Sequence, residues 1–459
     1  MESTLLVIGL NHRTAPMAMR ERFWISEPRR YAVLRQLARA EGIEEVMVLT
    51  TSSRTEFLIW ASEPTLAANS VLNFLSGDHG LKLSEWEHFY RLIEEEALAH
   101  IFRVTCGLDS PVLGEPEISA QVRTAWEQAR TVAGARRVLD SVIEKALGVS
   151  EDLRKKTGAP SVSIASAAEE LAIDVFEQLQ GKRVLLLGAG KINQNIARHL
   201  HQNGAELVCV IDQSPELAQQ LATELGGTAA TLADRWKRMA EADILVCSSG
   251  CPHVILTRPE AERIARERQG APLVILDIAT PRDVDPEVRR VDGVLLCDLE
   301  GLERIAQHNA AARNDRNAAA AAAEAEKTVR AEAQAFSNKL QAESVVPTIV
   351  ALRQRLDEIR RQDLESFIQE RGPFTREQDL ALHAITAQLV RRIANSLARE
   401  LKELPEKRER ERMTAAVQRL FHLETPKPAL AGTRSETNQH EQRNHDNNND
   451  NRPPIAVNS

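Results

Sequence analysis

Residues 183–193 read RVLLLGAGKIN, an apolar run that leads directly into a glycine-rich turn. Such a run of Val and Leu is typical of a parallel strand that is buried on both faces. In the turn, Gly188 permits the tight bend, Gly190 lets the backbone approach a phosphate, and the following helix favours an anion at its N-terminus. The pattern predicts a Rossmann-type nucleotide domain. The alternative is an α/β domain that binds no nucleotide.

The surrounding sequence supports a nucleotide domain, although Asn193 replaces the third glycine of the dinucleotide fingerprint. Further strand-like runs at 207–211, 244–247, 274–276 and 294–296 alternate with helical segments. We therefore expect a Rossmann-type nucleotide domain at residues 161–301. The pyrophosphate would be held by the turn and the first helical residues: Gly188, Ala189, Gly190, Lys191, Ile192 and Asn193.

Asp212 ends the second strand of this domain, about 20 residues after the glycine turn. A carboxylate at this place hydrogen-bonds a ribose 2′-hydroxyl and repels a 2′-phosphate. The alternative is that Asp212 only caps the next helix.

A second stretch, residues 45–60, reads EVMVLTTSSRTEFLIW. Its apolar runs at 46–49 and 57–60 suit two β-strands, and the small hydroxyl residues between them suit a loop that closes around a ligand. Arg54 could hold a carboxylate there through two hydrogen bonds. The alternative is an ordinary turn with a surface arginine.

Further along the chain, helical spacing over 94–130 is interrupted by a loop at 107–116. The loop offers backbone N–H groups, Ser110 and Glu115. The helix after Pro116 places Glu117 and Gln121 on one face because they are four apart. The alternative is a connection that only breaks a helix. Together with the strand-like runs, the pattern predicts an α+β domain over residues 1–160.

Four motifs together resemble those of a known family. They are GLNHRTAP at 9–16, TSSRTE at 51–56, GLDSPVLGEPEI at 107–118 and DIATPRDV at 277–284. In this order and at these spacings they resemble the glutamyl-tRNA reductase family, over residues 5–420. The resemblance implies NADPH-dependent reduction of glutamyl-tRNA(Glu) to glutamate-1-semialdehyde, for tetrapyrrole synthesis. NADH is the alternative cofactor, because Asp212 and Gln213 stand where the family usually has Asn-Arg.

The nucleophile position departs from the family. The family reads Thr-Cys-Asn-Arg-Thr-Glu, with the cysteine as nucleophile, where this chain has Ser52. The resemblance implies that Ser52 and His100 are catalytic. Helical spacing places Cys106 one turn before Ser110 on the same face, so Cys106 is either a substitute thiol or a packed small apolar residue. Glu117 stands where the family usually has glutamine. The substrate-binding residues that the resemblance implies are Thr51, Ser53, Arg54, Ser110, Glu115, Pro116, Glu117 and Gln121.

Two other functions stay open on the sequence. A catalytically weak or inactive homologue could still bind glutamyl-tRNA or a nucleotide, because a serine hydroxyl is less acidic than a thiol. A dehydrogenase of small metabolites would use the nucleotide domain, but it leaves both ends of the chain without a role.

The C-terminal part of the chain is helical in pattern. Residues 302–343 are Ala-rich and contain neither Gly nor Pro, which favours one long helix. Segments 349–370 and 377–404 carry apolar stripes without an obvious partner in the chain. We place a spinal helix and a helical dimerisation domain at 302–424, and a disordered tail at 425–459. The family resemblance also implies a homodimer, and it suggests delivery of the product to glutamate-1-semialdehyde aminomutase.

Composition limits the environment and the partners. The chain has 459 residues, a formal net charge of −8, and no apolar run near the roughly 20 residues that span a bilayer. We expect a multidomain cytoplasmic protein without a membrane segment. The charge argues against broad attraction to nucleic acid, though not against a local tRNA surface. The five cysteines lie mostly in apolar segments, so neither a disulfide framework nor a metal site is expected.

Overall fold

The computed structural model describes residues 3–112, 114, 116–133, 137–157, 164–312, 316–404 and 407–423. The chain divides into two compact units, Met1–Ser337 and Asn338–Ser459. Within the described residues, no helix is both long and apolar enough to cross a bilayer.

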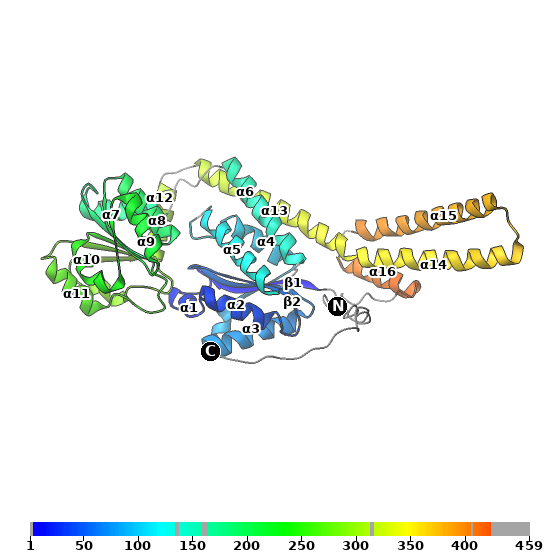
Figure 1. Cartoon of the computed structure of the whole chain (residues 1–459), viewed down its shortest axis with the longest axis horizontal. Helices are drawn as coiled ribbons and strands as arrows, with labels where there is room; N and C mark the ends of the chain where they lie inside the picture. Colours follow the sequence, from blue (N-terminus) through cyan, green and yellow to red (C-terminus); the bar gives the residue numbers. More distant parts are fainter. Residues whose placement is uncertain are drawn as a thin grey trace, which may run out of the picture. The chain divides into compact units, whose positions relative to one another are not determined.

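The first part of the larger unit confirms the expected α+β class. Its elements are β1 Thr4–Asn11, α1 Met17–Arg22, α2 Glu27–Leu37, β2 Ile43–Thr50, β3 Arg54–Ala61, α3 Pro64–His79, the 3₁₀ turn η1 Leu83–His88, β4 Tyr90–Ile93, α4 Glu95–Thr105, α5 Pro116–Ala133 and α6 Val138–Thr157. The strands form an antiparallel sheet of order β2-β3-β1-β4. Helices α4–α6 cover one face of the sheet and α3 covers the other (Figure 1).

The β2–β3 hairpin confirms the two strands expected at 46–49 and 57–60, and both strands are longer than those apolar runs. Only residues 51–53 lie between them, and Arg54 is the first residue of β3 rather than part of the loop. All of β3 except Trp60 is buried, because helices cover both faces of the sheet. The alternative of a turn with a surface arginine is wrong, since the Arg54 side chain is 0% exposed.

The second part of the larger unit confirms the Rossmann-type fold. Its elements are α7 Ile164–Phe176, β5 Arg183–Leu187, α8 Lys191–Gln202, β6 Glu206–Ile211, α9 Pro215–Leu225, β7 Thr228–Ala230, η2 Leu232–Asp234, α10 Arg235–Glu241, β8 Ile244–Cys247, α11 Arg258–Glu267, β9 Leu273–Asp277, η3 Pro286–Arg290, β10 Val294–Asp298 and α12 Leu299–Ala312. The strands pair in parallel in the order β10-β9-β8-β5-β6-β7.

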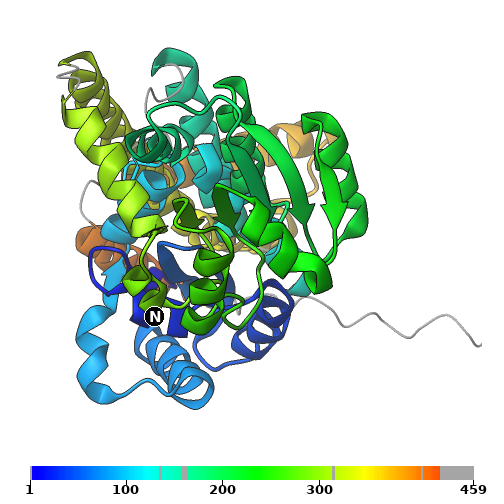
Figure 2. The ribbon, with the colours of Figure 1, turned by 90° about the vertical axis from the view of Figure 1, so that its left-hand side faces the viewer.

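Helices lie on both faces of this sheet, which is drawn in green in Figure 2. Side chains of β5 alternate between the two cores. Val184 and Leu186 pack with residues of α7, α8 and α9. Leu185 and Leu187 pack with residues of α10 and α11. This alternation explains why the strand is apolar at every position after Arg183.

The long helix expected at 302–343 is described as two segments, α12 and α13 Arg316–Ser344. Residues 313–315 between them lie outside the described residues. In the first unit, the ring of Phe336 on α13 lies 6.1 Å from that of Phe102 on α4. The helix is therefore packed against the α+β domain at this point.

The second unit contains α14 Val346–Arg371, α15 Arg376–Glu403 and α16 Lys407–Leu420. The first two confirm the helices expected at 349–370 and 377–404, and α16 was not expected. A small core joins the three helices and includes Ile349, Leu352, Leu401 and Val417. The predicted tail at 425–459 lies outside the described residues.

Candidate active site

Three hydroxyl residues form the tip of the β2–β3 hairpin. The Thr51 N–H donates to the Arg54 carbonyl at 2.8 Å, and the Ser53 N–H donates to Thr51 Oγ1 at 3.1 Å. Thr51 and Ser53 are buried and their hydroxyl oxygens lie 3.2 Å apart. Ser52 is half-buried, and among the described residues its hydroxyl has no hydrogen-bond partner. The tip therefore offers the Ser52 hydroxyl for a reaction.

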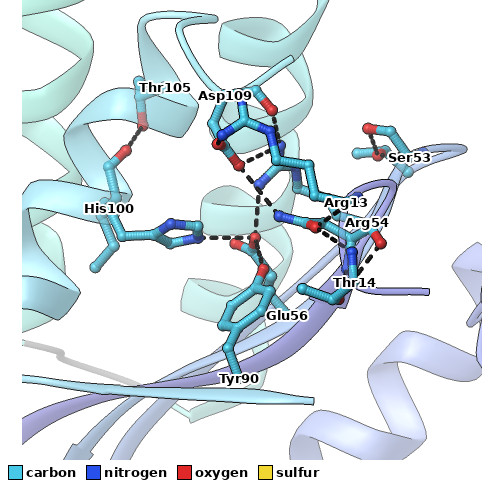
Figure 3. A network of polar contacts seen from close by, with 12 residues as sticks. Arg13, Thr14, Ser53, Arg54, Glu56, Tyr90, His100, Thr105 and Asp109 are labelled. Atoms are coloured by element: carbon cyan, nitrogen blue, oxygen red, sulfur yellow. Dashed lines mark hydrogen bonds and ion pairs between the residues drawn. The ribbon is translucent and has the colours of Figure 1, made fainter. Parts of the chain in front are cut away.

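Arg54 and Glu56 form a buried ion pair at the base of the hairpin. They are two apart on β3, so their side chains point to the same face. Arg54 Nη1 lies 2.7 Å from Glu56 Oε1, and the two side chains are 0% and 1% exposed. The same oxygen accepts hydrogen bonds from the Tyr90 hydroxyl and from His100 Nε2, the latter at 2.9 Å. Figure 3 shows the three donors converging on Glu56.

The charge state of Glu56 fixes the tautomer of His100. Burial alone would raise the pKa of the Glu56 carboxyl, but the charge of Arg54 outweighs burial and holds the pKa well below its usual range. An ionised carboxylate can only accept hydrogen bonds, so His100 donates from Nε2. In the neutral ring Nδ1 is then the basic nitrogen. An acidic residue orients the histidine of catalytic triads in the same way.

Asp109, in the loop after α4, provides a second carboxylate. Its carbonyl oxygen and its Oδ2 accept hydrogen bonds from Arg54 Nη2, the latter at 3.1 Å. Oδ2 also accepts from Asn11 Nδ2 at 3.2 Å, and Oδ1 lies 3.1 Å from Arg13 Nη1. The loop and the ends of β1 and β3 are thereby tied together (Figure 3). Arg54 Nε is buried and has no partner among the described residues.

The turn at the end of β5 needs glycine for two reasons. Gly188 has a φ of +100°, and a Cβ there would lie 2.0 Å from the Ser248 carbonyl oxygen, so no other residue fits. Gly190 has open space instead, with the nearest atom, Ser248 Oγ, 4.0 Å from its Cβ position. Lys191 begins the 12-residue helix α8 directly after the turn. This cradle fits the pyrophosphate of a dinucleotide.

Asn193 stands where the fingerprint has its third glycine, and its side chain replaces a close packing contact with hydrogen bonds. The residue is 0% exposed. Its Nδ2 donates to the carbonyls of Leu187 at 3.1 Å and of Gly188 at 2.8 Å. The first turn of α8 is thereby fastened to the glycine turn, which explains how the motif tolerates the substitution.

Asp212, at the end of β6, faces the same turn. Its Oδ2 accepts a hydrogen bond from the Ala189 N–H at 2.6 Å, and its Oδ1 accepts one from the Ser214 N–H at 2.7 Å. The alternative that Asp212 caps α9 is wrong, because the N-cap is Ser214, whose hydroxyl accepts from the Leu217 N–H. The carboxylate lies beside the turn, where the adenosine ribose lies in Rossmann domains.

Sequence models of three domain families match consecutive parts of the chain. "Glutamyl-tRNAGlu reductase, N-terminal domain" matches residues 8–157, "Shikimate / quinate 5-dehydrogenase" matches 170–305, and "Glutamyl-tRNAGlu reductase, dimerisation domain" matches 324–423. The chain is 34% identical over 420 residues to glutamyl-tRNA reductase 2 of Koribacter versatilis, covering 91% of this chain and 94% of that protein. The chain belongs to the glutamyl-tRNA reductase family.

Other members of the glutamyl-tRNA reductase family are similar to the chain over nearly its whole length. The protein of Desulforudis audaxviator is 35% identical over 435 residues, which cover 93% of this chain and 96% of that protein. The solved structure "Glutamyl-tRNA Reductase from Methanopyrus kandleri" has a TM-score of 0.50 at 26% identity, covering 91% of this chain and 99% of that one. A small-metabolite dehydrogenase would leave both flanking domains, which match models of the reductase family, without a role. The dehydrogenase-type middle domain indicates a nicotinamide cofactor.

Several of the residues predicted for a glutamyl-tRNA reductase lie in two places: four are at or next to the hairpin tip, and His100 lies across the charge network from it (Figure 3). His100, predicted to be catalytic, is engaged with Glu56, and among the described residues no hydrogen bond joins it to Ser52. The predicted substrate residues that are buried at or beside the tip are Thr51, Ser53, Arg54 and Ser110. Their binding roles stay predictions.

The other predicted substrate residues lie on or before α5. Glu117 and Gln121 are half-buried, and Glu117 Oε1 accepts a hydrogen bond from Asn195 Nδ2 on α8 at 3.3 Å. Glu117 therefore reaches toward the nucleotide domain. Glu115 and the side chain of Pro116 lie outside the described residues.

Cys106 is placed badly for the role of a substitute nucleophile. The helix α4 ends at Thr105, so Cys106 and Ser110 do not share a helical face, and the expectation from their spacing is wrong. Burial raises the pKa of the Cys106 thiol to about 12, although Arg154 and Ser150 on α6 oppose this. A thiol that stays protonated at neutral pH is a poor nucleophile, which favours the alternative of a packed small residue.

Sequence reasoning missed the two carboxylates and the phenol of the buried charge network. Glu56 and Asp109 stood inside the quoted motifs but were given no role, and Tyr90 lies outside them. The two-residue spacing of Arg54 and Glu56 on a strand was the available signal, because it predicts that a charged pair shares one face. No comparable local signal indicated Asp109, which comes from a distant loop.

Proposed function

We propose that this protein reduces glutamyl-tRNA(Glu) to glutamate-1-semialdehyde with NADPH, in tetrapyrrole (5-aminolevulinate) synthesis. The supporting observation is the Ser52 hydroxyl, which has no hydrogen-bond partner among the described residues, at a hairpin tip whose buried base orients a histidine, in a chain with both domains of the reductase family. In this proposal residues 1–160 form the catalytic domain, 161–301 the nucleotide domain, and 302–424 the spinal helix and dimerisation domain.

In the proposed reaction, the Ser52 oxygen attacks the ester carbonyl of the glutamyl group. The 3′-terminal oxygen of the tRNA leaves and takes up the proton that serine loses, while the glutamyl group stays on Ser52 as an ester. We assign the proton transfer to His100 Nδ1, the basic nitrogen of the neutral ring. Bound NADPH would supply the hydride that reduces the ester carbon. The Ser52 oxygen then leaves, regains a proton, and releases the aldehyde.

Ser52 should make this reaction slow. A hydroxyl is less acidic than a thiol and needs a base, and an oxygen ester accepts hydride less readily than a thioester. We expect Ser52→Cys to raise semialdehyde formation by at least about 100-fold, the range of one catalytic group, and Ser52→Ala to abolish it. The measurement is semialdehyde formation from glutamyl-tRNA with NADPH. Full activity in Ser52→Ala, with loss in Cys106→Ala, would move the chemistry to Cys106.

The second candidate is a catalytically weak homologue that binds glutamyl-tRNA. It is favoured by the missing thiol at Ser52 and by the engagement of Arg54 with two carboxylates. The two functions differ in the release of tRNA. The weak homologue is supported if the protein binds glutamyl-tRNA tightly but releases tRNA from it no faster than the ester hydrolyses without catalyst. Faster release supports the reductase.

We further propose that NADH competes with NADPH. Asp212 places a negative charge beside the glycine turn, where it would repel a 2′-phosphate. Asp212→Asn combined with Gln213→Arg should tighten NADPH binding about tenfold. Calorimetry with both cofactors measures this, and an unchanged or weaker affinity for NADPH would contradict the assignment.

We also propose a homodimer formed through the second unit, whose family match is a dimerisation domain. Large apolar side chains of α14 and α15 are between 37% and 61% exposed, namely Val346, Val350, Ile359, Phe367, Leu380, Ile385, Leu389 and Ile393. Such stripes are typical of helices that pair with a second subunit. Light scattering of a chain that ends before residue 345 should give a monomer. A dimer of that truncated chain would contradict the proposal.

A further inference from the structure

Helix α1 connects the hairpin tip with the nucleotide domain through two consecutive residues. Arg20 is buried and donates from Nη1 to the Ser52 carbonyl at 2.7 Å and from Nη2 to Glu300 in α12. The Glu21 carboxylate accepts two hydrogen bonds from Arg282, in the loop after β9. The donors are Arg282 Nε at 2.8 Å and Arg282 Nη2 at 2.7 Å. One short helix therefore contacts the tip and two segments of the nucleotide domain.

The Arg282 loop is in turn tied to the glycine turn. The next residue, Asp283, is fully buried and accepts hydrogen bonds from the Ser249 N–H at 2.7 Å and from the Ser249 hydroxyl at 2.6 Å. The preceding residue, Ser248, has the hydroxyl nearest to the open space over Gly190. A pyrophosphate over Gly190 would therefore lie against the segment that Asp283 holds.

We propose that α1 couples nucleotide binding to the nucleophile, and that Arg20 is a positioning residue that holds the Ser52 peptide. This inference rests on the proposed function, in which residue 52 is the nucleophile. Arg20 donates one Nη to the Ser52 carbonyl and the other to Glu300. A shift of α1 therefore alters both hydrogen bonds at once. A buried guanidinium keeps hydrogen-bonded partners because leaving them is costly, which favours discrete arrangements over gradual ones.

A thiol introduced by Ser52→Cys gives a measurement that needs no catalysis. The rate at which iodoacetamide alkylates this thiol is measured with and without saturating NADPH, by mass spectrometry of the labelled peptide. Native thiols interfere little, because burial raises the pKa of Cys106 to about 12 and of Cys297 to about 11. The remaining three are buried: Cys209, Cys247 and Cys251. We expect NADPH to change the rate about fivefold or more.

Variants of α1 then test the route. In the Ser52→Cys protein, the response to NADPH should be lost with Arg20→Met and with Glu21→Gln, and partly kept with Arg20→Lys, whose ammonium retains the charge. Arg22→Met is the matched control. Arg22 lies on the same helix but pairs with Glu85 inside the α+β domain, so the full response should remain. Each variant is measured at an NADPH concentration that saturates it.

Two results would overturn the inference. One is an equal labelling rate with and without NADPH in the Ser52→Cys protein, and the other is an undiminished response in Glu21→Gln. If Arg20→Met does not fold, Arg20→Lys and Glu21→Gln decide. Failure of the proposed function would look different: no variant would form semialdehyde, while NADPH would still change the labelling rate.

Discussion

The nucleotide turn is formed by backbone groups, whereas the base of the hairpin tip is formed by charged side chains. At the turn, Gly188 and Gly190 act by lacking a side chain, and the following helix contributes backbone N–H groups. At the base of the tip, charged side chains from separate elements meet, with Glu56 on β3, His100 on α4 and Asp109 in the loop after α4. A backbone site depends on consecutive residues, whereas the side-chain site depends on the tertiary fold, so substitutions should affect the two sites in different ways.

Neutralising a carboxylate in the side-chain site should have the largest effect. Glu56→Gln leaves the buried Arg54 with one anion and removes the carboxylate that orients His100. Removing one partner of a buried pair costs about 3–5 kcal/mol, so the free energy of unfolding should fall by that amount. Denaturant unfolding measures it.

The matched control for Glu56→Gln is Glu85→Gln, which removes one partner of a surface pair with Arg22. Surface pairs contribute little, so this variant should be nearly as stable as the parent. Equal losses in the two variants would contradict the view that the base of the hairpin is a buried charge network.

The two glycines of the turn should separate stability from binding. Gly188→Ala places a Cβ 2.0 Å from the Ser248 carbonyl oxygen at a φ of +100°, so it should destabilise the protein by at least about 2 kcal/mol and abolish cofactor binding. Gly190→Ala meets open space within the protein. It should keep the melting temperature but weaken NADPH binding about tenfold, because the methyl group occupies the phosphate cradle. Calorimetry and thermal melting of both variants test this, and unchanged NADPH binding in Gly190→Ala would remove the cradle assignment.

The sequence allowed the nucleotide domain to be predicted because its signals are local. The strand, the turn and the helix follow one another within 183–193, and each keeps its meaning without knowledge of the rest of the fold. Asn193 departs from the fingerprint in sequence, and the hydrogen bonds that compensate for it appear only in three dimensions. The strand β7 was missed because it has three residues and no apolar run.

The hairpin tip was predicted only in outline. Its strands followed from their apolar runs, but Arg54 was expected in the loop, because a charged residue rarely begins a fully buried strand. The burial of Arg54 depends on Glu56 and Asp109 together, and Asp109 is 55 positions from Arg54 in the chain. A pairing over that distance has no signature in one sequence. The same holds for the contact of Arg20 with Ser52 and Glu300.

Arg13 gives the smallest expected effect and the sharpest separation of binding from folding. Its side chain is 53% exposed and pairs with Asp109 at 3.1 Å, on the same carboxylate that Arg54 contacts. It is therefore a cation that can turn toward the glutamyl carboxylate without unfolding the network, because Arg54 continues to neutralise Asp109.

Arg13→Ala should raise KM for glutamyl-tRNA about tenfold, or about 1.4 kcal/mol of binding, with little change in kcat. Arg13→Lys should be intermediate, because a point charge replaces a planar fork. The unfolding free energy should change by less than about 1 kcal/mol, as for other exposed pairs. Steady-state kinetics in the more active Ser52→Cys protein measure the effect, with Arg22→Ala as the control for loss of a surface cation. An unchanged KM in Arg13→Ala would exclude Arg13 as a ligand of the substrate carboxylate.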